Sequence, residues 1–224
     1  MADYDSGGLD TLWWSPEEYA ELAQDLTKYG KNYEEYINAA LEAINNLGTS
    51  GAWTGYLYNQ LIEQINTERV TLDDDAMLLT ETIPTAISNQ AQEQASANHG
   101  SIAPINVAAL EGIINPQSTD DDGTGKVYLD PTTVNAAFDA FCQNMKQAET
   151  TAQKYSDLFN ATVARGFNVS RDIKVMGSSI ESAVEHVVSF IDKFGNAIPQ
   201  AATDSAHVMA AAQDQSSSEA EKIQ

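Results

Sequence analysis

The sequence predicts an all-α protein in which two long helical hairpins pack antiparallel into a four-helix bundle, the second hairpin being an internal duplicate of the first. Apolar residues recur at alternating steps of three and four along four long segments, which is the spacing of one packed seam on an α-helix. Within each half, a short glycine-bearing break separates two such segments, as in a helical hairpin. Landmarks of the first half return in the second half at a nearly constant offset, which indicates duplication.

The first hairpin is expected within residues 11–97, and its first helix opens with a dense set of capping signals. Ser15 suits the N-cap, Pro16 suits the first helical position, and Glu18 completes a capping box. The helix is expected to end at Gly48, because glycine adopts a left-handed cap at little cost. A helix of this length needs a partner along its whole apolar seam to be stable.

The second helix of this hairpin is expected to begin between Thr54 and Tyr56 and to continue to about Ala97. Pro84 lies inside it, and a bend is expected there because proline lacks a backbone donor. The next segment, residues 98–129, is a connector with several glycines and prolines. A short helix is expected within it for the apolar piece 105–114.

An acidic loop at residues 118–125 faintly resembles a calcium-binding loop. Ser118 fills its first position, and Leu129 stands where the bidentate glutamate belongs, so a polar turn is the favoured interpretation. A calcium site stays open as the alternative. Otherwise we expect no metal and no cofactor.

The second hairpin is expected within residues 130–214, and it repeats the landmarks of the first. The offset is 115 residues for the first-turn prolines, 114 for the aromatic residues in the breaks and 115 for the internal prolines: Pro16 and Pro131, Trp53 and Phe167, Pro84 and Pro199. The remaining residues, 215–224, are rich in serine with alternating charges and are expected to form a disordered tail.

Acidic residues outnumber basic ones, with 33 Asp and Glu against 11 Lys and Arg, which gives a net charge of −22. This balance argues against nucleic-acid binding, because phosphate contacts need clustered cations. No run approaches the roughly 20 apolar residues of a membrane span. The N-terminal residues lack the basic start and apolar middle of a secretory signal peptide. Cys142 is the single cysteine, so no intrachain disulfide is expected.

Trp53, Thr54 and Gly55 lie in the break between the first two helices. A long helical hairpin with Trp-x-Gly in its turn resembles the WXG family of small type VII secretion substrates. The resemblance covers residues 11–97, and the second half repeats the hairpin without the motif. It implies that the chain is a pseudo-dimer, equivalent to the antiparallel dimer of that family fused into one polypeptide. It also implies secretion by the type VII route without a cleaved signal peptide, with a cytoplasmic stage before export.

The resemblance further implies a non-enzymatic protein that acts through protein–protein contacts with a secretion-system ATPase, a cosecreted effector protein or both. The expected contact residues are Trp53, Gly55, Tyr56 and Phe167, since aromatic anchors dominate such interfaces. A second interpretation, compatible with the first, is that Trp53 plugs the end of the bundle. The export signal of the family, a Tyr followed four residues later by Asp or Glu, is missing after both second helices. Two alternatives therefore stay open: a cytosolic adaptor that delivers a larger toxin, and a purely structural helical module.

No arrangement of residues in the sequence indicates an enzyme. A di-iron bundle needs Glu-x-x-His pairs, and no Glu precedes His99, His186 or His207 by three residues. The sequence also contains no Gly-rich phosphate loop and no Gly-x-Ser-x-Gly nucleophile motif. We therefore expect no catalytic residues.

Overall fold

The computed structural model describes residues 15–119, 127–163 and 171–221, with side chains to residue 218, and it is mostly helical, as predicted. The helices are α1 (Pro16–Thr49), α2 (Tyr56–Met77), the π-helical turn η1 (Leu78–Thr82), α3 (Ile83–Ala97), α4 (Pro131–Val163) and α5 (Arg171–Glu221). Two short strands, β1 (Trp53–Thr54) and β2 (Tyr128–Leu129), pair antiparallel.

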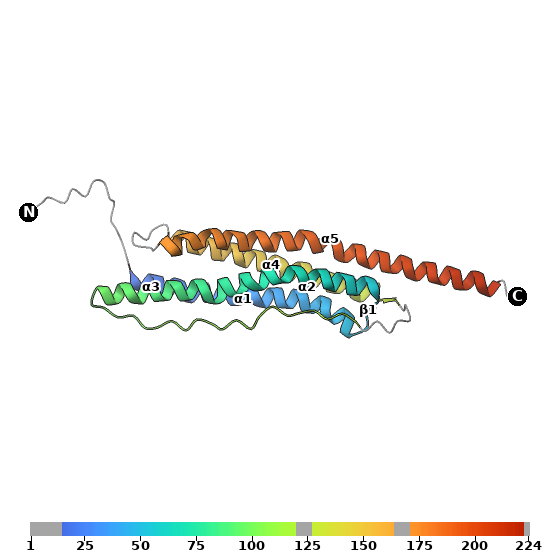
Figure 1. Ribbon diagram of the computed structural model, residues 1–224, viewed down its shortest axis with the longest axis horizontal. Coiled ribbons are helices and arrows are strands. Elements are labelled where there is room, and N and C mark those ends of the chain that lie inside the picture. Colours follow the sequence, from blue (N-terminus) through green and yellow to red (C-terminus); the bar gives the residue numbers. More distant parts are fainter. Residues whose placement is uncertain (1–14, 120–126, 164–170, 222–224) are drawn as a thin grey trace, which may run out of the picture.

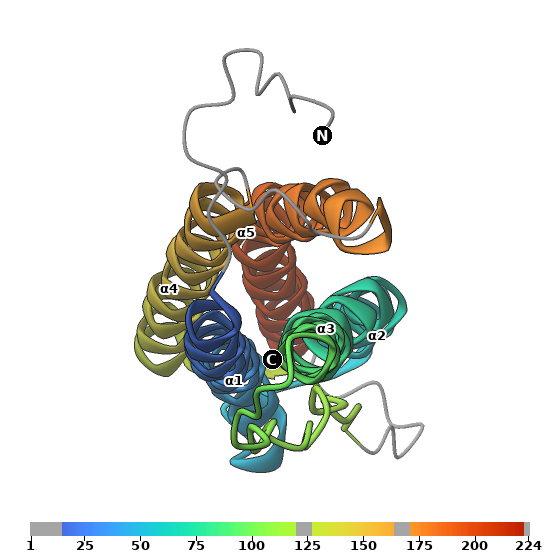
Figure 2. The same cartoon turned by 90° about the vertical axis from the view of Figure 1, so that its left-hand side faces the viewer.

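The helices lie side by side along one long axis, as Figures 1 and 2 show. α1 packs mainly against α4 and α3, while α5 packs against α4 and α2. The turn between α1 and α2 lies at one end of the molecule, whereas α4 ends and α5 begins at the other end (Figure 1). The described helices include none that is both long enough and apolar enough to cross a bilayer.

One contiguous apolar core runs along this axis and draws on all of the helices. Its largest fully buried side chains are mostly aromatic: Trp53, Tyr19, Tyr33, Tyr58, Tyr155, Phe141, Phe159 and Phe194. Burial of such side chains is the main favourable term in packing helices of this length.

Both predicted helix starts are confirmed, and each has a side-chain cap. The Ser15 hydroxyl accepts a hydrogen bond from the Glu18 N–H at 3.2 Å. At the start of α4, the Asp130 carboxylate accepts from the Thr133 hydroxyl at 2.6 Å and from the Thr132 N–H at 3.0 Å. These bonds hold the pKa of Asp130 below its usual value.

The irregularity expected at Pro84 begins one turn earlier, at η1. There the Ile83 N–H bonds to the Leu78 carbonyl, five residues back, so the Leu79 carbonyl is free for another donor. The Tyr155 hydroxyl of α4 donates to it at 2.9 Å. η1 also lies directly on α1, because a Cβ built on Gly30 would stand only 2.6 Å from the Leu79 oxygen.

The predicted disordered tail is wrong for residues 215–221, because α5 continues as one helix to Glu221. No glycine or proline follows Pro199 before Glu221, and the segment contains several alanines, so nothing in its sequence ends the helix. Its last turns extend beyond the other helices in Figure 1.

The predicted helix at residues 105–114 is also wrong, because the connector is extended there. β-branched residues and Pro104 disfavour a helix in this segment, and Gly112 has a φ of +91°. Residues 110–119, here called the strap, run along α1 and α2 (Figure 1). Polar side chains of α1, α2 and η1 bind the strap backbone and replace the hydrogen bonds that a helix would provide.

Candidate protein-binding site

The turn that joins α1 to α2 is built around two glycines with positive φ. Ser50 caps the end of α1, and its hydroxyl donates to the Asn46 carbonyl at 2.6 Å. Gly51 has a φ of +74° and Gly55 a φ of +106°, conformations that residues with a Cβ rarely adopt. The chain therefore reverses within a few residues, with Trp53 between the two glycines.

The side chain of Trp53 is fully buried. Its Nε1 donates to the Ser205 hydroxyl of α5 at 3.1 Å, and this hydroxyl donates to the Ala201 carbonyl at 2.9 Å. The Trp53 ring also lies 5.6 Å from the ring of Tyr58, whose hydroxyl donates to the Ile44 carbonyl. Burial raises the pKa of Tyr58 to about 12. Trp53 thus joins the turn to α5 and closes this end of the core.

The backbone of the same turn is tied to the start of α4. β1 pairs with β2, Trp53 lying opposite Leu129. The Asp130 N–H donates to the Ala52 carbonyl at 2.8 Å, one residue before α4 begins. The turn, α4 and α5 therefore meet at one point, although they are far apart in the sequence.

The four predicted contact residues have different environments. Trp53 is inaccessible, so it is not an exposed anchor and the plug interpretation describes it correctly. Gly55 shapes the turn as the N-cap of α2. Tyr56 is 64% exposed and offers an aromatic face beside the turn. Phe167 lies outside the described residues.

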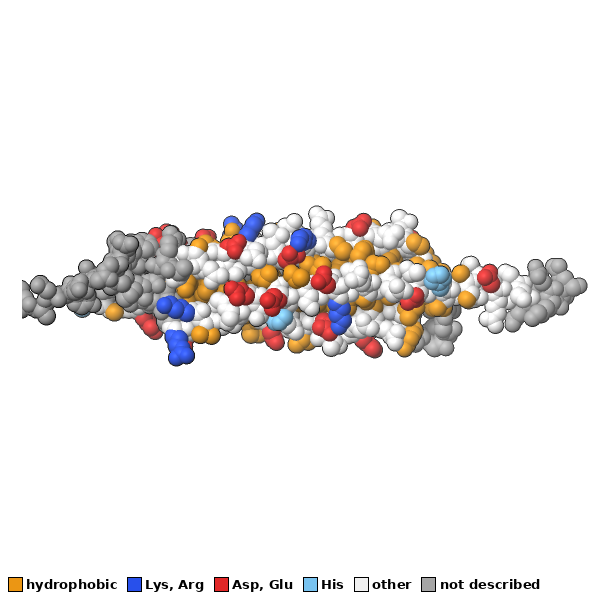
Figure 3. Space-filling model, turned by 90° about the horizontal axis from the view of Figure 1, so that it is seen from above, with side chains coloured by type: hydrophobic (Ala, Val, Ile, Leu, Met, Phe, Trp, Pro, Cys, Tyr) orange, Lys and Arg blue, Asp and Glu red, His pale blue; other side chains and the backbone are white. Residues whose placement is uncertain are grey.

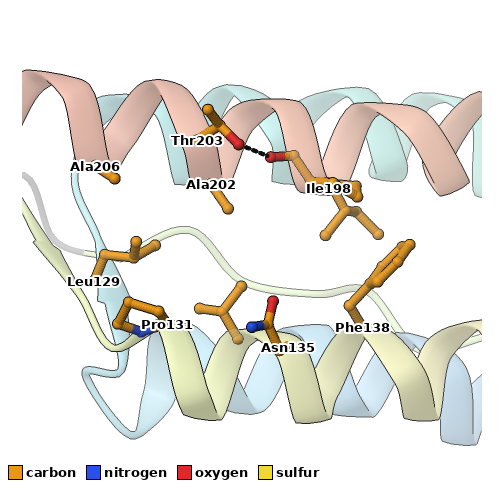
Figure 4. Close-up of a pocket in the computed structure, with 10 residues that line it drawn as sticks. Leu129, Pro131, Asn135, Phe138, Ile198, Ala202, Thr203 and Ala206 are labelled. Carbon is orange, nitrogen blue, oxygen red and sulfur yellow. Dashed lines mark hydrogen bonds between the residues drawn. The ribbon is translucent and has the colours of Figure 1, made fainter.

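An apolar groove lies beside this turn, between the first turns of α4 and the part of α5 around Pro199 (Figure 4). Its volume is about 330 Å³. One wall carries Leu129, Val134 and Phe138, and the opposite wall carries Ile198, Pro199 and Ala202. Hydrophobic side chains gather on this face near the end from which α5 projects (Figure 3).

The sequence placed some of these residues on the apolar seams of their helices. It did not reveal that α4 and α5 leave a groove between them at this point. Phe138 is only partly buried, and Ala202 is also partly exposed. The available signal was Pro199, which lies inside α5, where a proline favours a bend, and lines the groove.

A polar pair links α2 to α5 halfway along the molecule. Nδ1 of His186 lies 2.9 Å from the Asp75 carboxylate, whose side chain is only 8% exposed. Burial raises the pKa of Asp75, and the hydrogen bond to His186 acts in the opposite direction. Burial and the nearby Asp75 charge together raise the pKa of Tyr33 well above its usual value. The hydrogen bond to His186 is therefore the main interaction that offsets the cost of burying the Asp75 carboxylate.

Replacing His186 with alanine is expected to destabilise the chain by about 1 kcal/mol at pH 7, and by less at pH 4. Because the folded-state pKa of Asp75 is raised, the stability linked to this group is present below its unfolded pKa and is lost as pH rises through the folded value. Without the hydrogen bond to His186, the folded-state pKa of Asp75 is raised further, so more stability is lost as the pH rises. Urea midpoints at the two pH values measure it, with His207→Ala on the exposed part of α5 as the control. An equal loss for His186→Ala at both pH values would contradict this account.

Within the described ranges, no group of three or more His, Cys, Asp or Glu side chains is arranged to hold a metal ion. No protein-family model matches the chain, and no curated protein and no solved structure matches it. The functional proposal therefore depends on the residues and geometry of the chain itself.

Proposed function

We propose that the chain is a non-enzymatic WXG-like protein of type VII secretion, exported as or with a substrate and acting through protein–protein contacts. The observation that carries this proposal is the Trp53-Thr54-Gly55 turn at the tip of two long helices, with the tryptophan buried against α5. Such a closed tip suits a rod that presents its surface, rather than a cavity, to other proteins.

We further propose that the chain is a fused pseudo-dimer, a four-helix bundle of two duplicated hairpins. The burial pattern supports this, since residues 115 positions apart on α1 and α4 are buried in both copies. These pairs are Tyr19 and Val134, Leu26 and Phe141, Tyr33 and Ala148, Ile37 and Ala152, Ala40 and Tyr155, Ile44 and Phe159. Antiparallel hairpins are supported by Figure 1, where the turn between α1 and α2 lies at the end opposite to the last residues of α4 and the first residues of α5.

The proposed partner is a cosecreted protein that lays an amphipathic helix into the apolar groove. Tyr56 and the groove lie at the same end of the molecule. Beyond the groove, α5 continues as a helix to Glu221 and offers further surface on which a partner helix could lie. Residues 200–215 contain Asp204 and Asp214 but no Lys or Arg. A helix with apolar residues on one face and basic residues at its margins complements this surface.

Export is tested by comparing culture supernatant with lysate in cells with and without the secretion ATPase. Ala202→Glu is expected to lower export about tenfold while leaving the helical content unchanged, because it places a charge in the groove. Ala211→Glu, on an exposed part of α5, is the matched control. Export that is independent of the ATPase, or equal for the two variants, would count against the proposal.

One observation favours a cytosolic adaptor as the second candidate. In residues 98–129 the only tyrosine is Tyr128, and the residue four positions later is Thr132 rather than Asp or Glu. An adaptor would stay in the lysate and co-purify with a larger toxin. The same fractionation therefore separates the two functions.

A further inference from the structure

On another side of the molecule, the strap follows α1 and α2 (Figures 1 and 2). Four polar side chains of α2 and η1 bind the strap backbone at every third strap residue. These contacts are Asn59 with Thr119, Asn66 with Pro116, Asp73 with Ile113 and Glu81 with Leu110, at 2.6 to 3.1 Å.

The regular spacing of these contacts follows from helix geometry. Asn59, Asn66 and Asp73 are seven residues apart, or about 10.5 Å along an α-helix. Three extended residues also cover about 10 Å. Seven residues of the helix are therefore about as long as three residues of the strap, so each successive helix side chain meets the third strap residue along. The last step, from Asp73 to Glu81, is eight residues, because the π-turn η1 adds one residue and keeps Glu81 in register.

Side chains of α1 bind the strap backbone from its other side. The Glu34 carboxylate, almost fully buried, accepts from the N–H groups of Glu111 and Gly112 at 2.7 Å. Asn38 donates to the Gly112 carbonyl at 3.0 Å and accepts from the Ile114 N–H at 2.8 Å. These contacts reach main-chain atoms, so they do not depend on the strap side chains.

The strap side chains have the same three-residue period. Ile113 and Pro116 are buried and Leu110 and Thr119 are partly buried. The residues between them are mostly exposed: Glu111, Asn115, Gln117 and Ser118. A period of three is typical of polyproline II segments, which binding grooves often select. The surface of α1, α2 and η1 under the strap therefore fits an extended chain with a suitable anchor at every third residue.

One contact of the strap is incomplete. Asn59 donates to the Thr119 carbonyl and accepts from the Thr119 N–H, so both of its amide atoms are used. Asn66 donates to the Pro116 carbonyl at 2.9 Å, but its Oδ1 is buried without a partner in the described part of the chain. Proline has no N–H to offer there. A segment with an N–H at this position would satisfy Asn66 fully.

We propose that the surface formed by α1, α2 and η1 is a receptor for an extended segment of a partner protein. Its ligand has apolar anchors three residues apart and a residue other than proline opposite Asn66. The strap occupies the site in cis as an incomplete and displaceable ligand. This inference is independent of the export proposal.

The test uses the full chain with its strap released by Ile113→Asp and Pro116→Asp, which place carboxylates at the two buried anchor positions of the strap. Fluorescein-labelled peptide 106–119 is added, and anisotropy reports binding. We expect the released chain to bind it at least tenfold more tightly than the wild type, whose strap competes at high effective concentration. Ala109→Asp with Ser118→Asp, at one exposed position directly before the strap and one within it, is the matched control and should behave like the wild type.

The incomplete contact gives a sharper readout. A peptide that carries Pro116→Val should bind the released chain about five- to tenfold more tightly than the native peptide, because its N–H satisfies Asn66. Adding Asn66→Leu to the released chain should abolish this difference. A structural linker with no receptor role would give neither result.

Four outcomes would overturn the proposal, the fourth being that neither strap variant folds. In the first, the released chain keeps its helical circular dichroism but binds neither peptide at millimolar concentration. In the second, the two peptides bind equally to the released chain with Asn66 intact. In the third, the released chain dimerises instead, which would make a second copy the ligand. If the double variant does not fold, Ile113→Asp alone replaces it; failure of both to fold would show that the strap is part of the core.

Discussion

Trp53→Ala is expected to lower the free energy of unfolding by about 3 to 5 kcal/mol, the usual cost of removing a large buried aromatic side chain. Trp53 is fully buried, and its Nε1 is hydrogen-bonded to Ser205. The variant leaves a cavity beside the Tyr58 ring and removes the bond between the turn and α5. Urea denaturation followed by circular dichroism measures the change, and helical content should remain below the lowered midpoint.

Two further variants separate the loss of packing from the loss of the hydrogen bond and compare both with an exposed aromatic residue. Trp53→Phe keeps most of the packing but loses the hydrogen bond to Ser205, so we expect a smaller loss. Tyr56→Ala, three residues along the chain, should change stability by less than about 0.5 kcal/mol, because its side chain is mostly exposed. If Trp53→Ala and Tyr56→Ala had equal effects, the tryptophan would not be closing the core as described.

The sequence predicted the helices well because their signals are local. Ser15 and Asp130 cap helices in the structure as their neighbouring residues indicate, and the apolar seams are buried. The position of Trp53 in a turn was also predictable. Its orientation was not, because its partner Ser205 is 152 residues away and no local pattern joins the two.

The strap was missed for a related reason. The helix expected for the apolar piece 105–114 overlaps the start of the strap, but the N–H groups of Ile113 and Ile114 bond to side chains of other elements, which only the fold brings near. A signal was nevertheless present in the sequence. Asn59, Asn66 and Asp73 repeat at seven residues beside the apolar seam, and polar residues at one heptad position suggest a second contact face.

Gly30→Ala is expected to destabilise the chain by about 2 kcal/mol, opposite in sign to the usual effect of this change in a helix. An alanine normally stabilises a helix interior by up to about 1 kcal/mol relative to glycine. At Gly30 the added Cβ would stand 2.6 Å from the Leu79 oxygen and 2.7 Å from the Thr80 Cα, both backbone atoms of η1. The π-turn must move away from α1, which also disturbs the bond from Tyr155 to Leu79.

Gly195→Ala provides the control, because it makes the same change inside α5 where, apart from the local backbone of the helix itself, no atom lies within 4 Å of the new Cβ. It should stabilise the chain by about 0.5 to 1 kcal/mol. Urea midpoints of the two variants are therefore expected to move in opposite directions. A stabilising Gly30→Ala would mean that η1 is not in contact with α1, and the register that places Glu81 on the strap would then lose its support.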